Sequence, residues 1–118
     1  MADILLIEDD DDLRQDLAFL IRQRGFRVTT ASNGQDALDK LRDSDPPCLI
    51  LLDLMMPVMD GWTLRGQLLR NPALAGVPVV VLSGRADLDR DAHALRAVAW
   101  LSKPIDLTRL YALVTAHC

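Results

Sequence analysis

The sequence predicts an α/β fold in which a doubly wound parallel sheet of five strands is covered by helices on both faces. Short apolar runs recur along the chain, and segments with the spacing of amphipathic helices separate them in strict alternation. Short runs without polar alternation are typical of strands buried on both faces of a parallel sheet. Alternation of strands and helices implies right-handed crossovers between parallel strands.

Five segments are predicted strands. Residues 4–7, 48–52 and 77–82 are almost unbroken apolar runs. Residues 27–30 are rich in β-branched side chains, and residues 99–101 form a shorter apolar segment.

The first three helices are predicted from apolar spacing and from their ends. Acidic residues precede the first helix and favour its N-terminus, and Gly25 ends it. Its apolar face consists of Leu13, Leu17, Leu20 and Ile21. A second helix is predicted over residues 35–41, capped by Ser32 or Asn33, and a third over residues 62–70.

The last two helices complete the alternation. A fourth helix is predicted over residues 88–98, and a fifth begins after Asp106 as its cap. The apolar face of the fifth helix consists of Leu107, Leu110, Leu113 and Val114. No linker, repeat or low-complexity tract interrupts this order, so a single domain is expected over residues 1–118.

Composition limits the classes of function. Of the 118 residues, 50% are hydrophobic and 25% charged, as in a soluble globular domain, and the net charge of −4 disfavours direct nucleic acid binding. The sequence has neither an apolar stretch of membrane-spanning length nor a basic export signal. A cytoplasmic protein is therefore expected, in which Cys48 and Cys118 are reduced thiols that form no disulfide and no metal site.

Polar side chains follow four of the predicted strands at the points where these strands end. Ligands bind at the carboxyl ends of the strands in such sheets, so we expect these side chains to converge. They are Glu8, Asp9, Asp10, Asp11, Asp12, Asp53, Ser83 and Lys103.

This set of side chains suits phosphoryl transfer onto a carboxylate. Clustered carboxylates repel one another, and Mg²⁺ relieves the repulsion while accepting phosphate oxygens as further ligands. Asp53 can act as a nucleophile and form an acyl phosphate. Lys103 offers a positive charge and Ser83 a hydroxyl donor to the phosphoryl oxygens.

Each residue also has a plainer interpretation. An acidic run often serves only the first turn of a helix, Asp53 is also compatible with an ordinary turn, and Ser83 with a loop. The placement of suitable side chains after four strands favours the functional interpretation. The glycines form no dinucleotide-binding or Walker motif. Residues interpreted as exposed helix positions or as packing residues, without a role in the chemistry, are His93, His117, Met59 and Trp62.

Essentially the whole chain resembles the receiver domain of two-component response regulators. The resemblance rests on Ile-Leu-Leu-Ile-Glu-Asp-Asp at 4–10, Leu-Asp-Leu-Met-Met-Pro-Val-Met-Asp-Gly at 52–61, Val-Leu-Ser-Gly at 81–84 and Trp-Leu-Ser-Lys-Pro at 100–104. It implies a flavodoxin-like sheet with strand order 2-1-3-4-5.

The resemblance implies roles for individual residues around the acceptor. Asp53 is the expected phosphoacceptor. Asp9 is the expected direct Mg²⁺ ligand, Glu8 stands where aspartate is more common, and the Met55 carbonyl is a backbone ligand. Lys103 is the expected catalytic lysine.

The resemblance also implies a switch, for which Ser83 provides the hydroxyl and Trp100 the aromatic side chain, and a cis peptide bond before Pro104. Three features depart from the usual pattern. Tryptophan replaces tyrosine or phenylalanine at 100, only 20 positions separate Ser83 from Lys103, and Arg-Ala-Val-Ala at 96–99 replaces the usual Gly-Ala-Asp.

The predicted function is a phosphorylation-activated signalling switch. A sensor histidine kinase or histidine phosphotransfer protein donates the phosphoryl group to Asp53, which changes the affinity for an unknown output protein. The chain is expected to phosphorylate itself from the donor, to lose the group slowly, and to be a monomer or weak homodimer.

Two alternatives remain open at this point. The first is a docking scaffold that works without phosphorylation. The second is a small aspartyl-phosphate phosphatase of the haloacid-dehalogenase type, although that class needs a second aspartate at the position of Met55.

Overall fold

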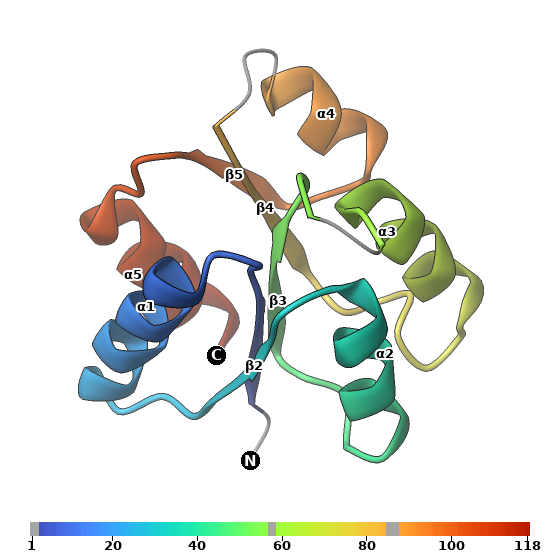
Figure 1. The fold of residues 1–118 in the computed structure, drawn as a ribbon, viewed down its shortest axis with the longest axis horizontal. Helices are drawn as coiled ribbons and strands as arrows, with labels where there is room; N and C mark the ends of the chain where they lie inside the picture. Colours follow the sequence, from blue (N-terminus) through green and yellow to red (C-terminus); the bar gives the residue numbers. More distant parts are fainter. Residues whose placement is uncertain (1–2, 57–58, 85–87) are drawn as a thin grey trace.

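The computed structural model describes residues 3–56, 59–84 and 88–118 and shows a central sheet with helices on both sides (Figure 1). The strands are β1 (Ile4–Ile7), β2 (Val28–Ala31), β3 (Leu49–Asp53), β4 (Val79–Ser83) and β5 (Ala99–Ser102). All pairs are parallel, and the spatial order is β2-β1-β3-β4-β5. The predicted fold class and strand order are confirmed.

Five helices alternate with the strands: α1 (Asp11–Gln23), α2 (Gly34–Arg42), α3 (Gly61–Arg70), α4 (Leu88–Ala94) and α5 (Leu107–His117). Four begin behind a side chain that accepts a backbone N–H of the first turn, namely Asp10, Asn33, Asp60 and Asp106. Asn33 rather than Ser32 therefore caps α2. Within the described residues, no helix combines the length and the apolar character needed to cross a membrane.

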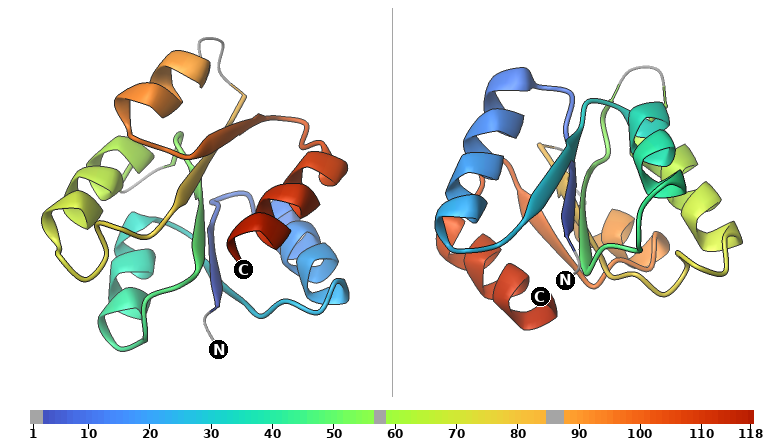
Figure 2. Two further views of the ribbon diagram at one scale, coloured as in Figure 1. Left: turned by 180° about the vertical axis from the view of Figure 1, so that it is seen from behind. Right: turned by 90° about the horizontal axis from the view of Figure 1, so that it is seen from below.

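Alternate strand residues point to opposite faces of the sheet, which explains the unbroken apolar runs. Leu5 and Ile7 of β1 pack with residues of α2, α3 and α4, whereas Ile4 and Leu6 pack with residues of α1 and α5. The two helical layers lie on either side of the sheet (Figures 1 and 2). Because both faces are apolar, polar side chains gather at the edges where the strands begin and end.

The fourth helix is shorter than predicted. The prediction ran over residues 88–98, but α4 ends at Ala94, and Arg96 adopts the left-handed conformation with a φ of 57°. The buried Arg65 of α3 donates from Nε to the carbonyl of Leu95 at 2.9 Å and from Nη2 to the carbonyl of Arg96 at 3.3 Å. Arg65 thus satisfies carbonyl groups that the end of the helix leaves without helical partners.

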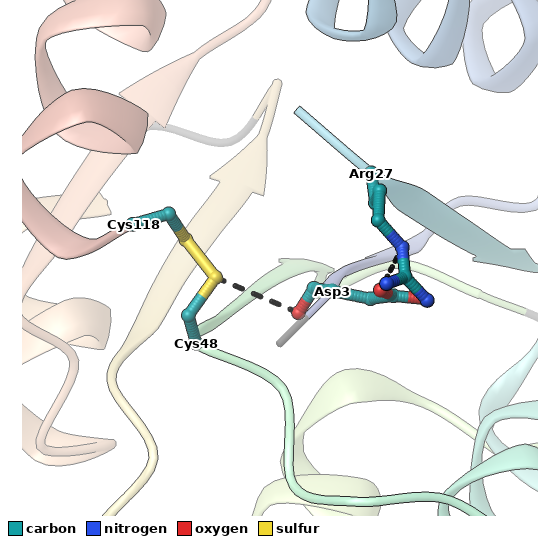
Figure 3. The surroundings of a disulfide bond; sticks show 4 residues. All are labelled: Asp3, Arg27, Cys48 and Cys118. Carbon is teal, nitrogen blue, oxygen red and sulfur yellow. Dashed lines mark hydrogen bonds and ion pairs between the residues drawn. A yellow bond between two sulfur atoms is a disulfide. The ribbon is translucent and has the colours of Figure 1, made fainter. Parts of the chain in front are cut away.

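The prediction of two reduced thiols is wrong, because Cys48 and Cys118 form a disulfide with Cα atoms 5.6 Å apart (Figure 3). Cys48 directly precedes β3, and Cys118 directly follows α5. The fold brings both to the amino edge of the sheet, where the Cys48 N–H donates to the carbonyl of Asp3 at 3.0 Å. The two cysteines are 70 positions apart, and only the tertiary structure reveals that they are neighbours.

Candidate functional site

Three acidic side chains meet at the carboxyl edge of the sheet. Glu8 follows β1, and Asp53 is the last residue of β3, the neighbouring strand. Carboxylate oxygens of Glu8, Asp9 and Asp53 all lie within 4.8 Å of one another. Glu8 is 0% and Asp53 is 1% exposed, whereas Asp9 is open to solvent. Two members of the cluster are therefore buried, and solvent reaches the cluster at Asp9.

Hydrogen bonds hold the loop between β1 and α1 in place. The Glu8 N–H donates to the carbonyl of Ala31 in β2 at 3.1 Å, and the Glu8 carbonyl accepts from Nη1 of Arg14 at 2.9 Å. The Asp9 N–H donates to Oε2 of Glu8 at 3.1 Å. Arg14 was not predicted to contribute, although its position in the first turns of α1 lets its long side chain reach back to this loop.

Lys103 places a positive charge inside the acidic cluster. Its Nζ lies 2.6 Å from Oε1 of Glu8 and 3.4 Å from Oδ2 of Asp53. Lys103 directly follows β5, and its backbone N–H donates to the carbonyl of Ser83 at the end of β4 at 3.0 Å. The Lys103–Pro104 peptide bond is cis, as the resemblance implied.

Burial and the neighbouring charges shift the pKa values of two groups in the cluster. Burial, together with the hydrogen bond to Asp53 and its charge, raises the pKa of Glu8 from 4.5 to about 8, although Lys103 opposes this. Burial alone lowers the pKa of Lys103, but its hydrogen bond to Glu8 and the charges of Asp53 and Glu8 outweigh burial and raise that pKa. Lys103 therefore does not offset burial and the neighbouring Asp53, and Glu8 keeps its proton near neutral pH.

The donor set fits Mg²⁺. Hard divalent cations prefer carboxylate oxygens, and Mg²⁺ keeps several waters beside one or two protein carboxylates. The oxygens of Glu8, Asp9 and Asp53 are close enough to share one ion, and the exposed Asp9 leaves a side open to water. A bound cation would favour the ionised form of Glu8, whose pKa burial and the neighbouring Asp53 raise.

Comparison with known proteins decides the family. A sequence profile of the response regulator receiver domain matches residues 4–115. The chain belongs to this family. Receiver domains are the phosphorylation-responsive modules of two-component signalling, and the carboxyl-edge cluster lies where the resemblance placed the reactive residues.

Two curated relatives show how far the similarity extends. A 14.6 kDa protein of Leptolyngbya boryana, encoded in the sodA1 3′ region, is 38% identical over 98% of this chain and 89% of that protein. The sensory transduction protein RegX3 of Mycolicibacterium smegmatis is 34% identical over 98% of this chain and 50% of RegX3. This chain thus spans most of the first relative and half of the second.

A solved structure supports the same assignment. The chemotaxis protein CheY4 of Vibrio cholerae superimposes on this receiver domain with a TM-score of 0.89 at 25% sequence identity. The superposition covers 100% of this chain and 99% of the CheY4 chain. The similarity therefore extends over the complete sheet and its helices.

The receiver domain brings most of the predicted site residues together. Its central group consists of Glu8, Asp9, Asp53 and Lys103. Ser83 is fully buried at the end of β4, at the same edge of the sheet. The Met55 N–H donates to Oδ1 of Asp53 at 3.1 Å, so the backbone of Met55 lies beside the expected acceptor.

Trp100 lies outside this central group. It is half-buried in β5, opposite Val81 of β4, and packs against the core on the α4 side of the sheet. The guanidinium carbon of Arg109 in α5 lies 4.6 Å from the centroid of a Trp100 ring, in a cation–π contact. Arg109 therefore restrains the side chain that the resemblance assigns to the switch.

Gly61 is a sterically restricted position that sequence reasoning treated only as part of a motif. A Cβ atom at residue 61 would lie 2.8 Å from both the carbonyl oxygen of Asp53 and the Cα of Leu54. The Gly61 N–H also donates to the carbonyl of Leu54 at 3.1 Å. The first residue of α3 thus packs directly on the backbone of the expected acceptor, and only glycine permits this approach.

The residues predicted to stand apart from the chemistry have mixed outcomes. Met59 and Trp62 pack against the hydrophobic core, and His93 is exposed, as predicted. His117 is half-buried rather than exposed, and it lines a cleft beside the disulfide.

Proposed function

We propose that this receiver domain accepts a phosphoryl group on Asp53 from a phosphohistidine of a sensor histidine kinase or phosphotransfer protein, and thereby changes its affinity for an output protein. One arrangement carries the proposal. The buried Asp53 carboxylate lies 3.4 Å from the amino group of Lys103 and within 4.8 Å of the carboxylate oxygens of Glu8 and Asp9. A nucleophile, a compensating charge and a cation site thus coincide.

In this proposal, an oxygen of the Asp53 carboxylate attacks phosphorus as the bond between phosphorus and the donor imidazole nitrogen breaks. The imidazole leaves with the bonding electron pair, and an acyl phosphate remains on Asp53. Lys103 and the Ser83 hydroxyl stabilise charge on the transferred phosphoryl oxygens. When bound by Glu8, Asp9, Asp53 and the Met55 carbonyl, Mg²⁺ supplies further positive charge to the same oxygens.

We propose that the signal then leaves through β5 and α5. The new phosphoryl oxygens draw the Ser83 hydroxyl toward Asp53, and Trp100 moves inward into the space beneath it. This movement separates Trp100 from Arg109, which lies 4.6 Å away in the unphosphorylated state. Beryllium fluoride with Mg²⁺ should therefore change Trp100 fluorescence in Trp62→Phe, and an unchanged emission with the mimic bound would remove Trp100 from the switch.

The proposed setting is the cytoplasm, with the unphosphorylated domain a monomer or weak homodimer and no direct nucleic acid contact. The net charge of −4 favours protein partners over a phosphate backbone. The exposed Asp9 leaves the acidic cluster open on one side, from which a donor histidine can approach.

Intact-mass analysis tests the proposal. The wild-type protein should gain one phosphoryl group from a small acyl phosphate in Mg²⁺ and none in excess chelator. Asp53→Asn should gain none. Asp60→Asn is the matched control, because Asp60 lies in the same loop region and caps α3 outside the cluster, and asparagine also caps helices. An adduct that forms in Asp53→Asn, or equally well in chelator, would contradict the assignment.

A further inference from the structure

The disulfide is the covalent link between the C-terminal end of α5 and the sheet. Cys48 directly precedes β3, the central strand, and its N–H donates to the carbonyl of Asp3 at 3.0 Å. Cys118 caps α5, and its N–H donates to the carbonyl of Val114 at 2.9 Å. The bond therefore fixes the last turn of α5 to a rigid part of the molecule.

The last turn of α5 has little apolar burial of its own. Leu110 and Val114 are fully buried and hold the middle of the helix against the sheet. Beyond Val114, Thr115 and Ala116 are exposed, and His117 is half-buried. Helix ends without apolar contacts open readily, so the order of this turn depends strongly on the disulfide.

The disulfide lies beside an open cleft. Cys118 is exposed, and both cysteines line an open cleft of about 260 Å³ together with Phe26, Arg27 and His117. Exchange needs access for the attacking thiolate of a reductant, which an open cleft provides.

We propose that Cys48 and Cys118 form a redox-responsive pair, which fastens the last turn of α5 when oxidised and releases it when reduced. This function goes beyond phosphoryl transfer and acts at the opposite edge of the sheet. Exposed disulfides are more often labile and regulatory than buried ones, and this pair lies beside an open cleft at the end of one helix.

The chemistry is thiol–disulfide exchange with a low-molecular-weight thiol or a protein dithiol. A thiolate of the reductant attacks one sulfur of the pair, breaks the disulfide and forms a mixed disulfide with that cysteine. A second thiolate of the reductant then attacks the mixed disulfide. The reductant is oxidised to its own disulfide. Cys48 and Cys118 together take up two electrons and two protons and become thiols.

Because α5 begins close to the proposed acceptor site and ends at the disulfide, the redox state affects the same helix through which we propose that the phosphorylation signal leaves. Asp106, the cap of α5, is three positions after Lys103, whose amino group contacts Glu8 and Asp53. The two edges of the sheet are thus connected through one helix. The redox response itself does not require that Asp53 is phosphorylated.

Glutathione buffers of graded ratio test the proposal on the unphosphorylated protein. After equilibration, free thiols are alkylated and counted by intact mass, and amide exchange is followed along the chain. The wild-type protein should pass from no alkylated thiol to two as the buffer becomes reducing, without global unfolding. Exchange at residues 115–118 should rise about tenfold on reduction, while β1 and β3 remain protected.

Cys118→Ser provides the matched variant, because it removes the link at an exposed position. It should show the fast exchange of the reduced wild type in every buffer. Three results would overturn the proposal: two free thiols under oxidising buffer, a disulfide that opens only when the protein unfolds, or equal exchange at residues 115–118 in both redox states. None of these readouts depends on phosphoryl transfer, so a failure here is distinguishable from a failure of the proposed function.

Discussion

The two edges of the sheet are held together by different kinds of interaction. At the carboxyl edge, the buried carboxylates of Glu8 and Asp53 both contact the ammonium group of Lys103. At the amino edge, a covalent bond joins Cys48 to Cys118. The comparison teaches that the carboxyl edge holds buried ionisable groups whose charge a cation can balance, whereas the amino edge is joined by a covalent bond.

Reduction of the disulfide at the amino edge should have the largest effect on stability. Opening a link between residues 70 positions apart should lower the free energy of unfolding by about 4 kcal/mol, through the greater entropy of the unfolded chain. Thermal unfolding with and without reductant should show a fall in Tm of about 15 °C. Cys118→Ser is the control and should not respond to reductant. Loss of phosphoryl acceptance in the reduced protein would show that the redox state acts on the acceptor site itself and not only on α5.

The carboxyl edge should make the protein without Mg²⁺ less stable as pH rises. The pKa of Glu8 is about 8 in the folded protein against 4.5 as its reference, so the folded state binds more protons between these values. Stability is therefore present below pH 4.5 and is lost as pH rises through about 8, by on the order of 3 kcal/mol between pH 5 and pH 8.

Urea unfolding at several pH values measures this loss, with Glu8→Gln as the matched variant. Glu8→Gln keeps the shape of the side chain and should flatten the pH dependence. Mg²⁺ should restore stability to the wild type at pH 8, because the cation favours the ionised carboxylates. A wild type whose stability rises from pH 5 to pH 8 in chelator would contradict the electrostatic account of this edge.

Removal of the shared ammonium group should slow phosphoryl transfer. In Lys103→Met the rate of adduct formation from a small acyl phosphate should fall about 100-fold, because one stabilising charge on the transferred group is lost. Intact mass against time at saturating Mg²⁺ provides the rate. Lys103→Arg keeps the positive charge and should recover part of the wild-type rate. A rate in Lys103→Met within threefold of the wild type would leave Lys103 with a structural role only.

A smaller effect is expected at the exposed member of the cluster. Asp9→Asn should weaken Mg²⁺ binding about tenfold and slightly stabilise the metal-free protein, because one of three neighbouring negative charges is removed. Calorimetric titration with Mg²⁺ measures the affinity. Asp12→Asn is the control, as an exposed acidic residue of α1 outside the cluster. Equal affinities in Asp9→Asn and the wild type would move the cation site elsewhere.

The same comparison explains how much of the molecule the sequence predicts. Glu8, Asp53 and Lys103 could be identified because each directly follows or ends a buried strand, and parallel topology alone brings such positions to one edge. Cys48 and Cys118 could not be paired, because their contact depends on where the end of α5 lies over the amino edge. Periodicity gives the existence of a helix but not the position of its last residue.

Two further features needed the tertiary structure for the same reason. The end of α4 depends on the left-handed Arg96 and on hydrogen bonds from Arg65, a residue of a different helix. The need for glycine at Gly61 depends on the approach of α3 to the backbone of Asp53. In both cases the deciding contact joins elements that are distant in the sequence, so the local sequence does not predict it.

Reduction of the acyl phosphate tests most directly the central claim that the carboxyl edge accepts a phosphoryl group on Asp53 with Mg²⁺. The protein is incubated with Mg²⁺ and a small acyl phosphate and then treated with borohydride, which converts a phosphorylated aspartate to homoserine. Peptide mass analysis should find homoserine at position 53, and the conversion should disappear when chelator replaces Mg²⁺. Homoserine at Asp9 or Asp60 instead, or no conversion in a folded protein that binds Mg²⁺, would contradict the account.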